Sequence, residues 1–390
     1  MVPLLPKVRP SPFGGWVTSI QKILVVLGLL FLFLMGIQCL GDGFKLLGRD
    51  LLNAFFATTE NPFIALMVGI LATTLVQSSS VTTAMIVGLV AAPENPLPIA
   101  NAIPMVMGAN IGTTVTNTLV SLAHVAHKDE FVRAFSVATC HDFFNFIAVA
   151  ILLPLEMATG FLRKTAVALA SSYGGIGGIQ YESPLKNVLK MAIDPIKQLV
   201  EWLLPGQGSQ AVLLILVSGV MIVSALFLLV RVMKSATESR VEVFITRSLS
   251  RSALLSMLVG VIVTVMVQSS SITTSLLVPL AGAGLLSLEH AFPVTLGANV
   301  GTTVTALLAT LAVVGPHAAA GVEIALVHVV FNFSGIVLIY PLKPIRRLPL
   351  MAARKLAEVA ARSRKWALIY MLCLFYGLPA ALVVLNRLFD

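Results

Sequence analysis

Long apolar stretches follow one another along the chain, and most of them have the length needed to cross a lipid bilayer. A helical crossing takes about 20 predominantly apolar residues. Seven stretches meet this length and predict transmembrane helices, at residues 21–40, 98–122, 131–154, 211–233, 290–313, 320–340 and 366–385. Two more, residues 62–90 and 253–280, are apolar at both ends but carry the polar string QSSS at their centres. The pattern predicts an all-α membrane protein.

The two QSSS strings interrupt apolar segments at a depth where polar side chains are poorly tolerated in a bilayer. Residues 62–76 would form a helix about 22 Å long, which ends beyond the middle of a hydrocarbon core about 30 Å thick. Residues 81–92 supply a similar length for a return arm. We therefore expect a re-entrant helical hairpin with QSSS at its tip in each half, at about residues 62–92 and 253–281.

Three motifs occur twice, in the same order and at nearly the same spacing, which indicates an internal repeat. The pairs are TTLVQSSSVTT (73–83) with TVMVQSSSITT (264–274), GANIGTTVT (108–116) with GANVGTTVT (297–305), and HDFFNF (141–146) with HVVFNF (328–333). If the hairpins do not cross, each half has three crossings, and an odd number inverts the second half. Inverted repeats with broken helices are a frequent plan of secondary transporters.

The predicted organisation has four parts. Residues 1–154 and 211–341 are the two inverted repeats, residues 155–210 are an extracellular linker with an interfacial helix, and residues 342–390 are a basic cytoplasmic segment with a C-terminal transmembrane helix. Within the linker, SSYGGIGGIQ (171–180) is expected to be a flexible loop, and residues 232–252 are expected to form a second cytoplasmic segment.

Composition excludes a soluble protein, because 57% of the residues are hydrophobic and only 11% are charged. The net charge of +9 does not indicate a nucleic-acid partner. Lys and Arg concentrate in residues 1–22, 231–251 and 343–365, which lie on one side of the predicted topology and place the N-terminus in the cytoplasm. The C-terminus is then extracytoplasmic. The three cysteines, Cys39, Cys140 and Cys373, lie in apolar segments and are expected to be small buried residues, with neither disulfides nor a transition-metal site.

The QSSS tips offer hydrogen-bond donors to an anion. We expect the return arm to begin directly after the tetrad, so that its free N–H groups and positive dipole end face the serines. The predicted anion-binding residues are Gln77, Ser78, Ser79, Ser80, Gln268, Ser269, Ser270 and Ser271. Small hydroxyl residues can also serve close helix packing, but the duplication of the complete string favours binding.

The GANxGTTVT motifs supply a second chemistry. A Gly-rich, unwound backbone there would expose carbonyl groups, and neutral oxygens of this kind suit Na⁺. The side-chain oxygens are those of Asn110, Thr113, Thr114, Asn299, Thr302 and Thr303. Neither Lys nor Arg occurs in residues 50–127 or 252–342, which hold both hairpins and both motifs. Because an uncompensated buried anion is very costly, the balancing charge is expected from helix dipoles and co-bound cations, which favours cation-coupled symport.

Asp142 is a carboxylate within the motif-bearing helices of the first half, and its repeat counterpart is Val329. A buried Asp in a membrane is costly unless it has a partner. We interpret Asp142 as a further Na⁺ ligand, with Asn145 of the same string beside it. The alternative is that Asp142 pairs with His141 or another polar neighbour. His141 and its counterpart His328 are interpreted as residues that fix helix geometry.

These motifs resemble those of the type II sodium-dependent phosphate cotransporters, a likeness that extends through IPMVMGANIGTTVTNT (103–118), FVRAFSVATCHDFFNF (131–146) and FPVTLGANVGTTVTALLA (292–309). The resemblance implies Na⁺-driven uptake of inorganic phosphate by alternating access, with phosphate between the two tips. It also implies one Na⁺ near Gln268, Ser269, Thr302 and Thr305. In that family an Asp at the position of Asp142 distinguishes electrogenic members.

The chain also departs from the animal members of that family. Its short outer loop has neither Cys nor a glycosylation sequon, which resembles a bacterial plasma-membrane member. His124 and His127 replace residues that form a peripheral sodium site in animal relatives.

Three other functions are compatible with some of these motifs: transport of a different oxyanion, hydrolysis within the membrane, and passive anion conduction. A symporter or exporter of another tetrahedral oxyanion, sulfate or arsenate, would need the same donors and stays open. An intramembrane serine hydrolase would rely on His141 and Asp142, but adjacent helical residues point about 100° apart, so an enzyme is not expected. A passive anion channel would not depend on Na⁺. The expected partners are phosphate, co-transported Na⁺ and the lipid bilayer, with no cofactor and no nucleic acid; the oligomeric state, a dimer included, is open.

Overall fold

The structure is a computed structural model that describes residues 19–46, 58–124, 127–174, 184–248, 252–313, 316–363 and 365–389. Throughout these ranges the regular structure is helical. The first helices are α1 (Ser19–Leu46), α3 (Pro62–Val76), α4 (Ser79–Val90), α5 (Ile99–Gly112), α6 (Val115–Ser121), the 3-10 turn η1 (Leu122–His124) and α7 (Lys128–Thr159). They are followed by α8 (Phe161–Gly174), α9 (Pro184–Leu203) and α10 (Gln207–Ser248). The last are α11 (Ala253–Val267), α12 (Ser270–Gly282), α13 (Leu288–Ala309), α14 (Ala318–Ile339), α15 (Lys343–Arg362), α16 (Lys365–Leu372), the π-helical turn η2 (Cys373–Gly377) and α17 (Leu378–Phe389).

Five described helical segments are long and apolar enough to cross a membrane: Lys128–Thr159, Gln207–Ala225, Leu288–Ala309, Ala318–Ile339 and Lys365–Asn386. Each coincides with a predicted span. The four helices that flank the QSSS strings have 15, 12, 15 and 13 residues, which is too short for a full crossing. The division of the apolar segments into long and short helices therefore agrees with the sequence, except for the predicted spans at residues 21–40 and 98–122, which are not among these five.

Three expectations about individual elements are wrong. The predicted span at residues 98–122 is divided, because α5 ends at Gly112 and α6 begins at Val115. Residues 232–248 do not form a segment of their own but continue the 42-residue helix α10. Residues 171–174 belong to α8 and not to a flexible loop, while residues 175–183 lie outside the described residues.

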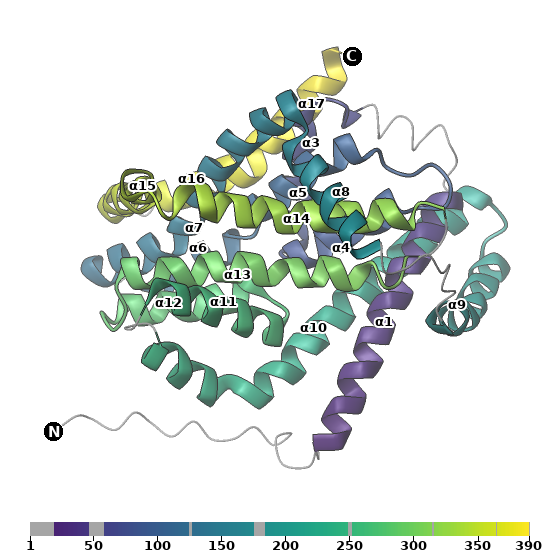
Figure 1. The fold of residues 1–390 in the computed structure, drawn as a ribbon, viewed down its shortest axis with the longest axis horizontal. Coiled ribbons are helices and arrows are strands. Elements are labelled where there is room, and N and C mark those ends of the chain that lie inside the picture. The colour runs from purple at the N-terminus through teal and green to yellow at the C-terminus, as the bar shows by residue number, and fades with distance from the viewer. Residues whose placement is uncertain are drawn as a thin grey trace.

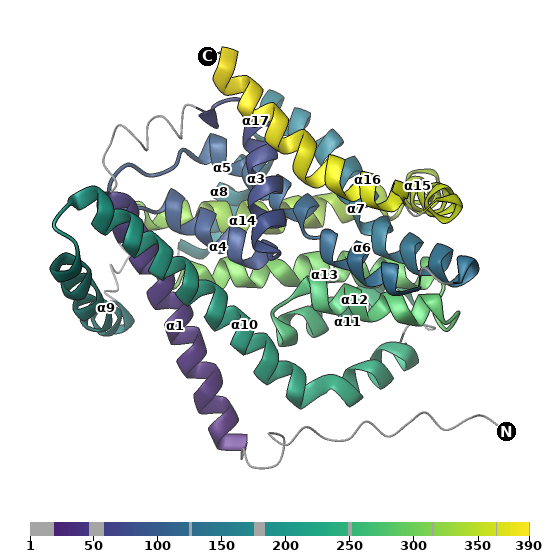
Figure 2. The same cartoon turned by 180° about the vertical axis from the view of Figure 1, so that it is seen from behind.

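The arrangement places α7, α13 and α14 at the centre of the molecule (Figure 1). Phe144 of α7 meets Phe292 of α13 edge to face, with ring centroids 6.1 Å apart, and both side chains are buried. In both views α9 and α15 lie at opposite ends of α13 and α14, and α1 packs along α10 (Figures 1 and 2). The C-terminal element α16–η2–α17 crosses over α3 (Figure 2). Of the helices that carry the motifs, α7, α13 and α14 are thus central, whereas α3 and α11 keep exposed apolar side chains.

Close helix crossings hold the motif helices of the first half together. Gly69 of α3 lies against the backbone of Met105 in α5, and Gly108 of α5 lies against the carbonyl oxygen of Leu66 in α3. A Cβ added at either glycine would overlap the backbone of the other helix. Small residues allow such close approach between membrane helices, so these glycines set the distance between α3 and α5.

The second half repeats this crossing with the corresponding residues. Gly260 of α11 lies against the backbone of Val294 in α13, and Gly297 of α13 lies against the carbonyl oxygen of Met257 in α11. The glycines of the two GAN motifs, Gly108 and Gly297, therefore have the same neighbours in the two halves. The internal repeat read from the sequence is accompanied by matching packing.

Candidate functional site

Each QSSS string breaks the helix with its first two residues and starts a new helix with the third. Gln77 and Gln268 have left-handed backbones, with φ of 57° and 55°, a region that non-glycine residues seldom adopt. Ser78 and Ser269 are extended, and each side-chain oxygen accepts from the backbone N–H three residues later, at 3.3 and 3.4 Å. The first serine is an N-cap. The new helix therefore begins within the tetrad. The sequence had led us to expect that it begins directly after the tetrad.

The remaining serines of each string occupy the first turn of α4 and α12, where the first N–H groups lack intrahelical acceptors and the dipole adds positive charge. These serines are Ser79, Ser80, Ser270 and Ser271. Within the described part of the chain, their hydroxyl groups make no hydrogen bond. Ser79, Ser80 and Ser270 are each 4% exposed. Each tip thus presents unused donors in a largely buried setting, which an anion with several oxygens could occupy.

The amide of Gln77 is fully engaged by the protein. Its Nε2 donates to the carbonyl oxygen of Thr74 and, at 3.3 Å, to the hydroxyl of Tyr376. Its Oε1 accepts from the hydroxyl of Thr116 at 2.9 Å. Because an amide nitrogen has two hydrogens to donate, both are used, and the first tip is fixed to α6 and to the C-terminal element.

The amide of Gln268 makes the equivalent contacts except one. Its Nε2 donates to the carbonyl oxygen of Val265 at 2.6 Å, and its Oε1 accepts from Thr305 at 3.0 Å. One amide hydrogen has no acceptor among the described residues. Three predicted sodium ligands, Gln268, Ser269 and Thr305, therefore lie together, and Thr302 lies one turn before Thr305 on α13.

Adjacent residues of α6 connect the two QSSS elements. Thr116 holds Gln77, as described, and its neighbour Asn117 reaches α12 of the second half. The Asn117 amide donates to Thr274 at 2.8 Å and accepts from Thr274 and Ser275 at 3.0 and 2.8 Å. Sequence reasoning missed Asn117, although it is a departure from the repeat, whose second copy has Ala306 at this position.

The expectation of an unwound backbone is wrong for the second GAN motif, and in the first motif the helix is interrupted only at two residues. The second motif lies entirely within α13, and the first is helical except for a turn at Thr113–Thr114 that keeps right-handed helical dihedrals. The glycines serve the helix crossings instead of unwinding. The hydroxyls of Thr113, Thr302 and Thr303 donate to carbonyl oxygens of their own helices, at 3.1, 3.1 and 2.7 Å. Their oxygens keep lone pairs, so their roles as Na⁺ ligands stay predictions.

Buried His and Asn side chains cross-link the halves. The His141 ring nitrogen Nε2 contacts Oδ1 of Asn299 in the second half, and Nε2 of His328 contacts Oδ1 of Asn110 in the first at 3.4 Å. Asn145 donates to the Asn110 carbonyl oxygen at 2.9 Å and accepts from Asn299 at 3.0 Å. All five side chains are buried. This pattern agrees with a structural role for the histidines, while the sodium roles of the three asparagines stay predictions.

Asp142 is buried, with one carboxylate oxygen engaged and the other without a partner. The hydroxyl of Tyr370 donates to Oδ2 at 2.8 Å. Oδ1 has no hydrogen-bond partner in the described chain. His141 contacts Asn299 and not Asp142, which removes the histidine pairing considered from the sequence. The sequence also allowed Asp142 to pair with an unidentified polar neighbour, and in the structure this neighbour is Tyr370 of α16.

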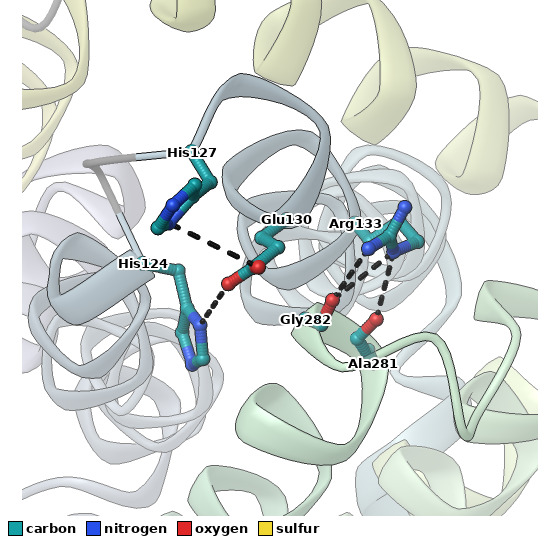
Figure 3. A network of polar contacts seen from close by, with 6 residues as sticks. All are labelled: His124, His127, Glu130, Arg133, Ala281 and Gly282. Atoms are coloured by element: carbon teal, nitrogen blue, oxygen red, sulfur yellow. Dashed lines mark hydrogen bonds and ion pairs between the residues drawn. The ribbon is translucent and has the colours of Figure 1, made fainter.

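The histidines at the start of α7 surround one carboxylate. Glu130 lies 3.6 Å from Nδ1 of His124 and 3.9 Å from Nδ1 of His127 (Figure 3). Glu130 was not singled out in the sequence. The pair of histidines thus shares one acidic neighbour.

Arg133, one turn further along α7, holds the end of α12. Its guanidinium donates to the carbonyl oxygens of Ala281 and Gly282, at 2.7 to 3.2 Å (Figure 3). A cation at a helix C-terminus compensates the dipole. The charge of Arg133 therefore acts at the end of α12 opposite to its serine tip. Of the three cysteines, Cys39 and Cys140 are buried as expected, whereas Cys373 is exposed.

Comparison with known proteins gives a consistent set of relatives. The Na⁺/Pi-cotransporter family model matches residues 32–179 and 221–378, one stretch in each half. The rat (Rattus norvegicus) sodium-dependent phosphate transport protein 2A is 35% identical in an alignment 435 positions long that covers 93% of this chain and 67% of that protein. The human (Homo sapiens) sodium-dependent phosphate transport protein 2B is 32% identical in an alignment 449 positions long that covers 93% of this chain and 64% of that protein. The chain spans about two thirds of the length of these relatives. No solved structure matches it.

Proposed function

The chain belongs to the Na⁺/Pi-cotransporter family, and we propose that it is a multi-pass membrane symporter that couples Na⁺ entry to the uptake of inorganic phosphate. One observation carries this proposal. Each QSSS tip is a capped helix start with unused N–H and hydroxyl donors, and neither Lys nor Arg occurs in residues 50–127 or 252–342. The tips can bind an anion, but they cannot neutralise it.

Charge balance then requires a cation. Phosphate carries about −1.5 to −2 charges at neutral pH, and its burial without compensation is prohibitive. Co-bound Na⁺ supplies the missing charge. One sodium site consists of Gln268, Ser269, Thr302 and Thr305. It is supported by the hydrogen bond from Thr305 to the amide oxygen of Gln268. The free Oδ1 of Asp142 supplies a ligand for a further Na⁺, so transport is electrogenic.

Alternating access follows from the repeat. The short α3–α4 and α11–α12 pairs are re-entrant hairpins of two inverted repeats, and phosphate lies between their tips. The matching glycine crossings and the positions of α9 and α15 at opposite ends of the central helices support this arrangement (Figures 1 and 2). The membrane of the proposal is the plasma membrane, which is the inner membrane of a bacterium. Because α15 is rich in Lys and Arg, we place α15 and the N-terminus on the cytoplasmic side.

Uptake of radiolabelled phosphate into proteoliposomes tests the proposal. We expect accumulation only with an inward Na⁺ gradient, faster with an inside-negative potential, and none when choline or K⁺ replaces Na⁺. Excess unlabelled sulfate tests for other tetrahedral anions, since it should compete weakly if phosphate is the substrate, whereas arsenate, which has the shape and charge of phosphate, should compete. Full uptake in choline would overturn Na⁺ coupling, and full inhibition by sulfate would overturn the assignment of the anion.

Gln268→Ala is expected to lower uptake by about 100-fold or more. The change removes an amide that bridges Thr305 and the anion site, and two lost hydrogen bonds of about 1.5 kcal/mol each have this effect. Gln198→Ala, on the exposed surface of α9, is the matched control and should transport as the wild type does. Transport by the Gln268→Ala protein at the control rate would remove Gln268 from the site.

A further inference from the structure

We propose that the C-terminal element α16–η2–α17 positions the transport site through two tyrosines: Tyr370 orients the Asp142 carboxylate for a cation, and Tyr376 fixes the amide of Gln77. Neither tyrosine lies in the QSSS, GAN or HDFFNF motifs. The inference rests on the proposed function, because it assigns the residues that hold one proposed sodium ligand, Asp142, and the first QSSS tip in place.

Tyr370 determines which oxygen of Asp142 is free. Its hydroxyl donates to Oδ2 at 2.8 Å. Its ring stacks on Phe143 at 6.5 Å between centroids and meets Phe375 edge to face at 5.8 Å. A ring held on two sides gives the hydroxyl a fixed position, so Oδ2 is occupied and Oδ1 stays available. An unpartnered buried carboxylate oxygen is costly, and a cation at Oδ1 removes that cost.

Tyr376 acts on the first QSSS tip. Its hydroxyl lies 3.3 Å from Nε2 of Gln77 and 3.4 Å from the carbonyl oxygen of Thr74, at the end of α3. Among the residues that the structure describes, the second tip has no equivalent contact, since the partners of the Gln268 amide there are Val265 and Thr305. Tyr376 therefore distinguishes the two glutamines: Gln77 is fully held by the protein, whereas Gln268 keeps one N–H for a ligand.

A π-helical turn carries the second tyrosine contact. In η2 the N–H of Leu378 bonds to the carbonyl oxygen of Cys373, five residues back. Single π-helical turns are rare and occur frequently at functional sites. Tyr376 lies within this turn, whereas Tyr370 lies just before it in α16, so one continuous element makes both contacts. The element thus couples the carboxylate on α7 to the tip that follows α3.

The test compares Tyr370→Phe and Tyr376→Phe with Tyr340→Phe in proteoliposomes. Tyr340 is the matched control, because its ring packs under Arg346 at 4.9 Å and the described chain gives its hydroxyl no hydrogen bond. We expect Tyr370→Phe to raise the Na⁺ concentration for half-maximal uptake about tenfold, with the phosphate KM within twofold of wild type. Tyr376→Phe should raise the phosphate KM about fivefold and leave the Na⁺ dependence within twofold. Equal changes in both constants for both variants would indicate a merely structural role and overturn the proposal.

A binding measurement separates this proposal from the proposed function. The Tm of the detergent-solubilised protein in NaCl, relative to choline chloride, reports Na⁺ binding without transport. We expect the Na⁺-dependent rise in Tm to be smaller for Tyr370→Phe than for Tyr340→Phe. If the wild type shows no phosphate uptake but this difference is present, the proposed substrate fails and the role of Tyr370 stands. Equal rises in the two variants would overturn the role of Tyr370 even if the wild type transports phosphate.

Discussion

The two halves of the molecule share their helix crossings but differ in their polar contacts. In each half a GAN helix meets the helix before QSSS through paired glycines, and a threonine of the GAN motif, Thr116 or Thr305, holds the QSSS glutamine. Three polar residues of the first half, Asp142, Asn117 and Arg133, correspond to Val329, Ala306 and Ala320 in the second. Both C-terminal tyrosine contacts also reach the first half.

This difference separates two tasks. The shared glycines and glutamines set the geometry that any duplicated binding site needs, so they are present twice. The residues found once reach across the molecule: Asn117 and Arg133 contact α12, and Asp142 contacts α16. We infer that the shared contacts build the tips and that the unique ones make the two halves unequal in ion coupling.

The shared crossings give the largest expected effect. Gly297→Ala would force the new Cβ into the backbone of Met257, so α11 and α13 must separate, at a cost of about 3 kcal/mol in the free energy of unfolding. We expect a strongly lowered Tm in detergent and loss of uptake. Gly219→Ala is the control, because a Cβ there has no atom within 4 Å. A Gly297→Ala protein as stable as this control would contradict the role of the crossing.

The substitution Asp142→Val replaces the carboxylate of the first half with valine, the residue at the corresponding position, Val329, of the second half. We expect Na⁺-dependent uptake to persist but to lose its response to potential, because the substitution removes the carboxylate that we propose as the ligand of an additional Na⁺. One net charge per cycle is worth about 2.3 kcal/mol per 100 mV, or about 40-fold in the accumulation ratio. Phosphate accumulation at imposed potentials of opposite sign measures this. An unchanged potential dependence would show that Asp142 does not determine the transported charge.

Asn117→Ala removes the link from α6 to α12, again by installing the residue of the other half. The lost hydrogen bonds to Thr274 and Ser275 should lower stability by about 1 kcal/mol. A double-mutant cycle with Ser275→Ala isolates the contact. Coupling of at least ~0.5 kcal/mol is expected, and additive changes in Tm would mean that the 2.8 Å contact contributes nothing measurable.

Arg133→Ala should have the smallest effect. The side chain is exposed at the end of α12, and a cation at a helix C-terminus contributes about 0.5 kcal/mol under such conditions. The loss of Tm should shrink as the salt concentration rises, because exposed charges are screened. Lys190→Ala, exposed on α9, controls for removal of a positive charge. A salt-independent loss of stability would point to packing rather than charge.

The sequence predicted the elements that depend on local pattern. The apolar lengths and the QSSS interruptions were sufficient to place the long helices and the helix breaks, because the energetic cost of polar groups in a membrane acts residue by residue. The same reasoning failed at the GAN motifs, where glycine was interpreted as a sign of unwinding. In the structure Gly108 and Gly297 stay helical and admit a neighbouring backbone.

The contacts that were missed join residues far apart in the chain. Asn117 and Thr274 are separated by 157 positions, Asp142 and Tyr370 by 228, and Gln77 and Tyr376 by 299. Nothing in the pattern around Tyr370 or Tyr376 distinguishes them from other aromatic residues of an apolar helix. The departure from the repeat at Asn117 was visible in the sequence, but its partner was not.

By itself the sequence determined that this chain is a duplicated, helical membrane protein whose polar strings carry hydroxyl and amide groups without cationic partners. That much follows from composition and order, since each residue's preference for lipid or water is its own. Only the tertiary structure decided which polar atoms are satisfied by the protein and which remain free, such as Oδ1 of Asp142 and the serine hydroxyls. The reason is that hydrogen bonding is directional and short-ranged, so a donor's availability depends on which distant helix is packed beside it.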